Sequence, residues 1–220
     1  YKKVRKYTLS QKYKLISELA NGNVILDYGS GAGAFLNYFN KKGWDVKGVE
    51  ADKETRDRVI AETSLDIISP AQISALDREK FDIVTLWHVL EHVHQLKDTI
   101  GALVNSLKKD GSLLIAVPNC NSLDALNYGK YWAAFDVPRH LYHFRPLDIA
   151  KLFKEYNIGV VDTLPMVFDS YYVSMLSEKH KAGGSGFFGG IVNGFLSNVK
   201  GDPKSSFSSQ IYILRKNKAI

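Results

Sequence analysis

The sequence is poor in the features that mark secreted, membrane-spanning and nucleic-acid-binding chains. Its single cysteine, Cys120, excludes an internal disulfide framework and favours a reducing, cytoplasmic setting. It has no signal-peptide pattern and no apolar run long enough to cross a bilayer. No acid occurs in residues 1–14, where six of the 29 basic residues lie, and the other 23 balance the 23 acids of the chain. We therefore do not expect nucleic acid as the main partner, and interpret the basic segment as a solvated helix face or linker.

Strand-like and helix-like segments alternate along the rest of the chain, which is typical of a parallel sheet covered by helices on both faces. The clearest helix begins near Gln95, and an Asp110-Gly111 turn is expected to open the strand that follows it. The expected strands are 24–27, 45–50, 65–68, 81–86, 112–117, 159–168 and 210–216; further helices are expected over 34–42, after Asp52, and from Pro146 to about Tyr156.

A glycine-rich turn follows the first expected strand and is the most informative feature of the chain. Asp27 precedes Gly29, Gly31 and Gly33, and Glu50 ends the second strand nineteen residues after Gly31. This order places backbone amides, a helix N-terminus and an acid for ribose hydroxyls at the edge where open α/β sheets bind nucleotide-like ligands. The same spacing fits a nicotinamide dinucleotide, but Asp27 would repel a pyrophosphate and attract a cofactor with ammonium and sulfonium groups.

Several motifs together resemble class I S-adenosylmethionine-dependent methyltransferases, in the branch of ubiquinone-biosynthesis-like enzymes that act on small molecules. The motifs are Asp27-Tyr28-Gly29-Ser30-Gly31-Ala32-Gly33, Glu50, Leu86-Trp87-His88-Val89-Leu90-Glu91-His92-Val93, Val117-Pro118-Asn119 and Asp136-Val137-Pro138-Arg139-His140-Leu141-Tyr142-His143-Phe144. The resemblance covers most of residues 20–168. It departs at Ser30, where many relatives carry Cys, and at Arg145, where they often carry Ser or Thr.

The resemblance implies an α/β, Rossmann-like fold: a seven-stranded, mostly parallel sheet with an antiparallel last strand and helices on both faces. We expect residues 1–20 to form a basic helical lead-in and residues 21–220 the methyltransferase domain, with acceptor-side insertions at 119–145 and 170–208. The implied cofactor is S-adenosylmethionine. Its binding residues would be Asp27, Gly29, Ser30, Gly31, Gly33, Glu50, Ser69, Leu86, Trp87 and His88.

The run from His88 to His92 also matches H-x-x-E-H, the inverted zinc-peptidase signature. That chemistry needs both histidines on one helical face and a third protein ligand downstream. Here the run leaves an apolar strand, and regular helix is expected only from Gln95. We therefore expect no metal, and expect Glu91 and His92 to hold the loop or lie near the cofactor.

The aromatic and polar segment after the fifth strand is the expected acceptor side. A histidine there could take a proton from a hydroxyl during O-methylation, and we rank His140 before His143 as this base; C-methylation also stays open. Tyr131, Trp132 and Arg139 are the expected binding residues for a small-molecule acceptor, although Arg139 and His140 fit a structural role equally well.

The apolar, glycine-rich segment 183–199 favours a hydrophobic or lipid-linked acceptor and contact with a membrane surface, but a loop packing its own aromatic residues fits equally well. Two other functions stay open: an NAD(P)-dependent oxidoreductase, and a non-catalytic cofactor-binding module of a longer protein. The chain opens with Tyr1 rather than Met, which leaves room for an upstream segment, and nothing in the sequence fixes the oligomeric state.

Overall fold

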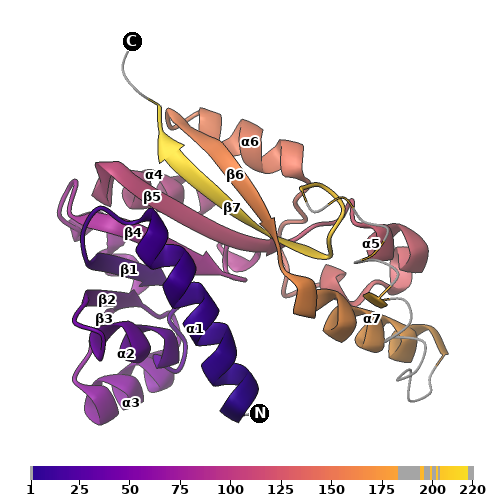
Figure 1. Cartoon of the computed structure of the whole chain (residues 1–220), viewed down its shortest axis with the longest axis horizontal. Helices are drawn as coiled ribbons and strands as arrows, with labels where there is room; N and C mark the ends of the chain where they lie inside the picture. The colour runs from indigo at the N-terminus through magenta and orange to yellow at the C-terminus, as the bar shows by residue number, and fades with distance from the viewer. Residues whose placement is uncertain (1, 183–193, 196–198, 200–201, 203, 218–220) are drawn as a thin grey trace. The chain divides into compact units, whose positions relative to one another are not determined.

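A computed structural model describes residues 2–182, 194–195, 199, 202 and 204–217 (Figure 1). The chain divides into two compact units. Unit 1 comprises Tyr1–Trp87, Lys97–Leu114 and Leu214–Ile220, and unit 2 comprises His88–Leu96 and Ile115–Ile213. Most of the apolar, glycine-rich segment 183–199, within the expected insertion 170–208, lies outside the described residues, so its predicted contact with an acceptor or membrane stays a prediction.

The strands form a seven-stranded sheet in the order β3-β2-β1-β4-β5-β7-β6. It is mostly parallel with antiparallel strands at its end, which confirms the predicted fold class. The strand bounds are β1 Val24–Tyr28, β2 Asp45–Val49, β3 Asp66–Ile68, β4 Phe81–Trp87, β5 Leu107–Pro118, β6 Ile158–Pro165 and β7 Ser209–Lys216.

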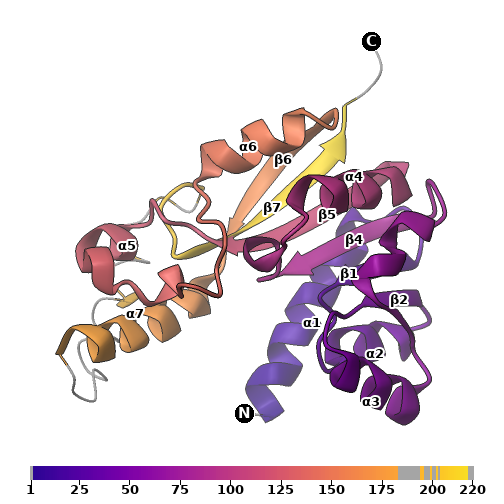
Figure 2. The same ribbon diagram turned by 180° about the vertical axis from the view of Figure 1, so that it is seen from behind.

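Unit 1 is built on parallel strands whose carboxyl ends meet at one edge. In the register of these strands, Tyr28 pairs with Val49 of β2 and Leu86 of β4, and Val49 pairs with Ile68 of β3. The predicted glycine turn and Glu50 therefore follow neighbouring strands and come together. Figures 1 and 2 show α1 and α4 on opposite faces of these strands. The helices are α1 Lys2–Leu19, α2 Ala34–Asn40, α3 Lys53–Thr63 and α4 Leu96–Ser106, with the short 3-10 helix η1 at Pro70–Ala75.

The predicted Asp110-Gly111 turn is wrong, because β5 is continuous from Leu107 to Pro118. A Cβ atom on Gly111 would lie 2.8 Å from Leu107 Cδ1 and 3.0 Å from the backbone oxygen of Asp82. The glycine therefore serves close approach of β4 and the preceding leucine rather than chain reversal. An Asp-Gly pair occurs both in turns and at tightly packed positions inside strands, so the sequence alone did not distinguish the two.

Unit 2 holds the remaining helices. The predicted strand 159–168 ends earlier, at Pro165, and α7 begins at Val167. Figures 1 and 2 show α6 beside β6, and α5 beside α7. The bounds are η2 Leu90–His92, α5 Leu123–Tyr128, η3 Gly129–Tyr131, η4 Ala133–Phe135, α6 Pro146–Lys154 and α7 Val167–Ala182. In the described part of the chain, no helix combines the length and the apolar character that crossing a bilayer requires.

Candidate functional site

The glycine turn after β1 has the backbone geometry that its sequence predicts. Gly29, Gly31 and Gly33 have φ values of 83°, 51° and 68°, in the left-handed region that favours glycine. A Cβ atom on Gly33 would lie 2.6 Å from Val59 Cγ1, so this glycine lets α2 begin against α3. A Cβ atom on Gly31 would meet nothing within 4 Å. The turn is thus closed on its protein side and open at Gly31, where a ligand can approach the backbone.

Glu50 is tied to this turn at the end of β2. Its Oε2 accepts a hydrogen bond from the Gly31 amide at 2.7 Å, and its Oε1 accepts one from the Asp52 amide at 2.9 Å. A carboxylate has about four lone-pair sites, so two remain for further donors. The predicted ribose acid is therefore oriented by the backbone and still able to accept from two hydroxyls.

Asp27 is a buried carboxyl at the end of β1, with 3% of its surface exposed. Burial raises its pKa to about 6, against the lowering effects of a hydrogen bond from Thr85 and the charge of Lys12. The Thr85 hydroxyl lies 2.6 Å from Asp27 Oδ1. A carboxylate held this far from water gains strongly from a cationic ligand.

Lys12 is the residue that sequence analysis missed in unit 1. Its Nζ lies 3.6 Å from the centroid of the Trp87 ring and 5.8 Å from that of Phe35, and its charge acts on Asp27. The predicted solvated basic face of α1 thus contributes one cation to the site. Nothing in the sequence around Lys12 indicates a role in the site, because only the fold brings α1 to the end of β4.

The remaining predicted residues of unit 1 differ in what they present. Trp87 is half-buried, and its indole Nε1 has no hydrogen-bond partner among the described residues; the same holds for the buried Ser30 Oγ. Ser69 caps η1 and hydrogen-bonds Gln72. Leu86 is fully buried, so its side chain belongs to the core. The unpartnered Trp87 nitrogen fits a polar ligand such as the predicted cofactor, whereas Ser30 Oγ lies toward Gly48, beside the buried Leu36 and Ile67.

Unit 2 contains a cavity of about 570 Å³, a volume typical of small-molecule sites. Its walls are partly apolar, from Pro118, Tyr172, Val173 and Leu176 among others. Its polar lining consists of His88, Glu91, Asp136, Arg139, His140, Asp169, His180 and Ser209. The cavity suits a ligand with an apolar body and a polar end.

His88, the last predicted cofactor residue, directly follows Trp87 in the chain but belongs to unit 2. Its φ of 56° is unusual for a residue with a side chain. Its Nε2 lies 2.8 Å from Asp169 Oδ2, and its Nδ1 lies 3.5 Å from Glu91 Oε1. Burial acts to lower its pKa, but the two carboxylates raise it to about 9, so His88 is a cation at neutral pH. Asp169 was not predicted, because a strand was expected up to Phe168, where α7 has already begun.

The predicted acceptor residues separate into two groups. Arg139 and His140 line the cavity, and Arg139 forms an ion pair with Asp136 at 2.6 Å. His140 Nδ1 lies 2.7 Å from the Ala134 carbonyl oxygen, and burial lowers the pKa of this histidine.

The other acceptor residues do not line the cavity. His143 is exposed, and its Nε2 lies 2.8 Å from the Phe135 carbonyl oxygen. Trp132 is buried, and its Nε1 donates to Asp124 Oδ2 at 2.9 Å. Tyr131 is 37% exposed. Trp132 packs in a core with Ala125, Tyr128 and Ala134. Its neighbours in the sequence do not show whether it belongs to such a core or to the wall of a pocket.

Comparisons with known proteins show the family of the chain. A family profile described as a methyltransferase domain matches residues 1–163. The ubiquinone biosynthesis O-methyltransferase of Neisseria meningitidis serogroup C is 23% identical over 163 residues, which cover 67% of this chain and 68% of that protein.

Solved structures share the fold. A SAM-dependent methyltransferase from Archaeoglobus fulgidus superposes with a TM-score of 0.62 at 17% identity, covering 96% of this chain and 94% of its own. Phosphoethanolamine N-methyltransferase 2 of Haemonchus contortus, solved with S-adenosyl-L-methionine, gives a TM-score of 0.64 at 15% identity. The match covers 96% of this chain and 53% of that one.

Proposed function

The chain belongs to the family of methyltransferase domains, and from this premise we propose that it methylates a hydroxyl oxygen of a small, partly apolar acceptor. It is an S-adenosylmethionine-dependent methyltransferase. We propose further that oxygen is the methylated atom, that the acceptor is partly apolar, and that the residues described below have the roles given to them. The observation that carries it is a neutral histidine, His140, in the wall of a partly apolar cavity.

The cofactor would be held by residues of unit 1. S-adenosylmethionine supplies an electrophilic methyl group when bound. The Asp27 carboxylate would attract its ammonium group, and the two remaining lone pairs of Glu50 would accept from its ribose hydroxyls. The face of Trp87, which now lies against a lysine ammonium, is suited to a cationic sulfur.

The acceptor would occupy the cavity of unit 2. His140 Nδ1 faces a carbonyl, which only accepts, so the ring proton resides on Nδ1 and Nε2 carries a lone pair. Nε2 can then take the hydroxyl proton as the oxygen gains the methyl group. Asp136 Oδ2, 3.8 Å from Nε2, would stabilise the imidazolium formed. The curated relative named above is an O-methyltransferase, which supports oxygen as the methylated atom.

Catalysis of this kind depends mainly on position. The sulfonium is already a good electrophile, so in-line alignment and exclusion of water supply most of the acceleration. His88, Arg139 and Asp169 would orient the polar end of the acceptor, and Tyr172 and Leu176 would cover its apolar part. A cytoplasmic setting is part of the proposal and rests on the lone Cys120.

The test is release of S-adenosylhomocysteine in the presence of phenols and catechols that carry alkyl chains of increasing length. We expect turnover with hydroxyl-bearing acceptors and none with their methyl ethers. His140→Ala should lower kcat by about 100-fold or more, the typical contribution of a general base. The exposed His94→Ala is the matched control. Binding of the cofactor product without turnover on any acceptor would contradict the proposal and favour a non-catalytic module.

A further inference from the structure

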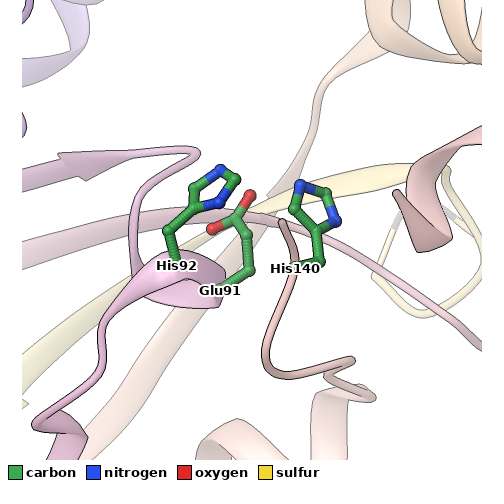
Figure 3. A group of neighbouring side chains, drawn as sticks. All are labelled: Glu91, His92 and His140. Atoms are coloured by element: carbon green, nitrogen blue, oxygen red, sulfur yellow. The ribbon is translucent and has the colours of Figure 1, made fainter. Parts of the chain in front are cut away.

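Three side chains of the types that bind metals gather beside the unit 2 cavity, and two of them, Glu91 and His140, line it. Glu91 and His92 lie on η2, and His140 comes from the loop that follows η4. One ligand atom from each of the three lies within 4.8 Å of the others. Figure 3 shows the Glu91 carboxylate between the two imidazoles. The His92 and His140 ring centroids are 4.7 Å apart, so the rings are held close together.

Both imidazoles have their protons fixed by the backbone. His92 Nδ1 lies 2.9 Å from the Arg139 carbonyl oxygen, and His140 Nδ1 lies 2.7 Å from that of Ala134. A carbonyl oxygen only accepts, so each Nδ1 is the donor, and Nε2 is the nitrogen that can offer a lone pair to a metal ion. Histidines that bind metals usually donate their other ring proton in this way, which fixes tautomer and orientation.

Glu91 is a buried acid whose side chain lacks hydrogen bonds to the described residues. Only 1% of its surface is exposed, and neither carboxylate oxygen has a hydrogen-bond partner among the residues that the structure describes. The nearest cation is His88, whose Nδ1 lies 3.5 Å from Oε1. Leaving a buried carboxylate without hydrogen bonds is costly. Two lone-pair nitrogens beside such a carboxylate form a set that a metal ion would satisfy.

We propose that Glu91, His92 and His140 bind one divalent first-row transition-metal ion, with zinc as the probe. Two imidazoles and one carboxylate are a known catalytic zinc set, which leaves a coordination position open. Zinc lies about 2.0–2.2 Å from such ligands, so the present spacing requires the side chains to close by about 1 Å.

This site differs from the zinc-peptidase pattern that the sequence contains. That pattern would pair His88 with His92, whereas His88 faces Asp169 and Glu91. The third ligand here is His140, forty-eight residues after His92. His88 would support the site from outside, by donating to the glutamate that binds the ion.

The open position of the ion would face the cavity that also receives Arg139 and Asp169. This consequence rests on the proposed function: a hydroxyl bound to the ion would lose its proton to solvent water more easily, so no free His140 lone pair would be needed as the base. The metal site itself does not depend on which acceptor the chain uses.

Binding is measured by calorimetry with zinc, and with cobalt by its visible absorption, on the metal-stripped full chain. We expect one equivalent per chain, and at least about 100-fold weaker binding in His92→Ala, in His140→Ala and in the isosteric Glu91→Gln. His94→Ala, an exposed histidine two residues from His92, should bind as the unchanged chain does. Thermal unfolding confirms that each variant folds. No binding by the unchanged chain, or equal binding by all variants, would overturn the site.

A second arm separates this site from the proposed function. Removal of the metal should lower turnover with hydroxyl acceptors to the rate that the free His140 base supports and leave S-adenosylhomocysteine binding intact, and zinc should restore the higher rate. Full turnover by the stripped chain would overturn the role of the ion in the reaction. Failure of the methyltransferase proposal would instead appear as absent turnover with and without zinc.

Discussion

Replacing Asp27 by Asn should stabilise the folded chain while weakening the site. The carboxyl has a pKa of about 6 in the folded state against 3.8 as the ordinary value, because burial disfavours its charge. At about 1.4 kcal/mol for each pKa unit, this difference corresponds to about 3 kcal/mol. The variant, which never carries the charge, should gain up to this amount at pH 7.5.

The pH dependence follows from proton binding. Between about pH 4 and pH 6 the folded chain holds the Asp27 proton and the unfolded chain does not, so this group lowers stability as pH rises through that window. Below about pH 4 both states are protonated and the cost vanishes. Asn lacks this titration, so its advantage should grow from near zero at pH 4 to its full value above pH 6.

Urea unfolding of both proteins at several pH values measures the difference directly. A difference independent of pH, or an Asn variant less stable at pH 7.5, would refute the reasoning. The functional cost appears in calorimetry: S-adenosylhomocysteine should bind about 10-fold to 100-fold more weakly to the variant at pH 7.5, from loss of a charge-assisted bond. In the unchanged chain its affinity should fall as pH drops below about 6.

Three further predictions concern residues of either unit. Lys12→Met should raise the affinity for S-adenosylmethionine several-fold more than that for S-adenosylhomocysteine, which lacks the sulfonium charge, since the change removes a competing cation; equal changes in both dissociation constants would contradict this. Gly33→Ala should lower the free energy of unfolding by about 2 kcal/mol or more through its clash and left-handed φ, and Gly31→Ala by only about 1 kcal/mol from φ alone; equal losses in urea would refute it. His143 lies outside the cavity, so His143→Ala should keep at least half of the turnover of the unchanged chain, whereas His140→Ala should lose most of it; product release measures both.

The sequence predicted the arrangement of residues around the glycine turn better than that of the residues after β5. Asp27, the glycines and Glu50 lie at strand ends within a short stretch, and parallel pairing brings such ends to one edge whatever the details of packing. The family comparison confirms the methyltransferase and its cofactor. The Asp110-Gly111 turn failed because a glycine that permits close packing has the same local pattern as a glycine that turns the chain.

The acceptor side depends on contacts between distant residues, which periodicity does not reveal. Asp169 reaches His88 only because α7 starts where a strand was expected. Trp132 resembles a pocket residue in sequence, yet a hydrogen bond to Asp124 holds it in a core. His140 joins the acid and histidine of η2 across nearly fifty residues, so a pattern search that looks for nearby ligands does not find this cluster.

The most direct test of the central claim is calorimetric titration of the chain with S-adenosylhomocysteine, beside NADH on the same preparation. We expect saturable binding of S-adenosylhomocysteine at one site, weakened at least about tenfold in Glu50→Ala, and no binding of NADH. Binding of NADH alone would contradict the claim and favour an oxidoreductase. Binding of neither compound would contradict the assignment of the glycine turn as a cofactor site.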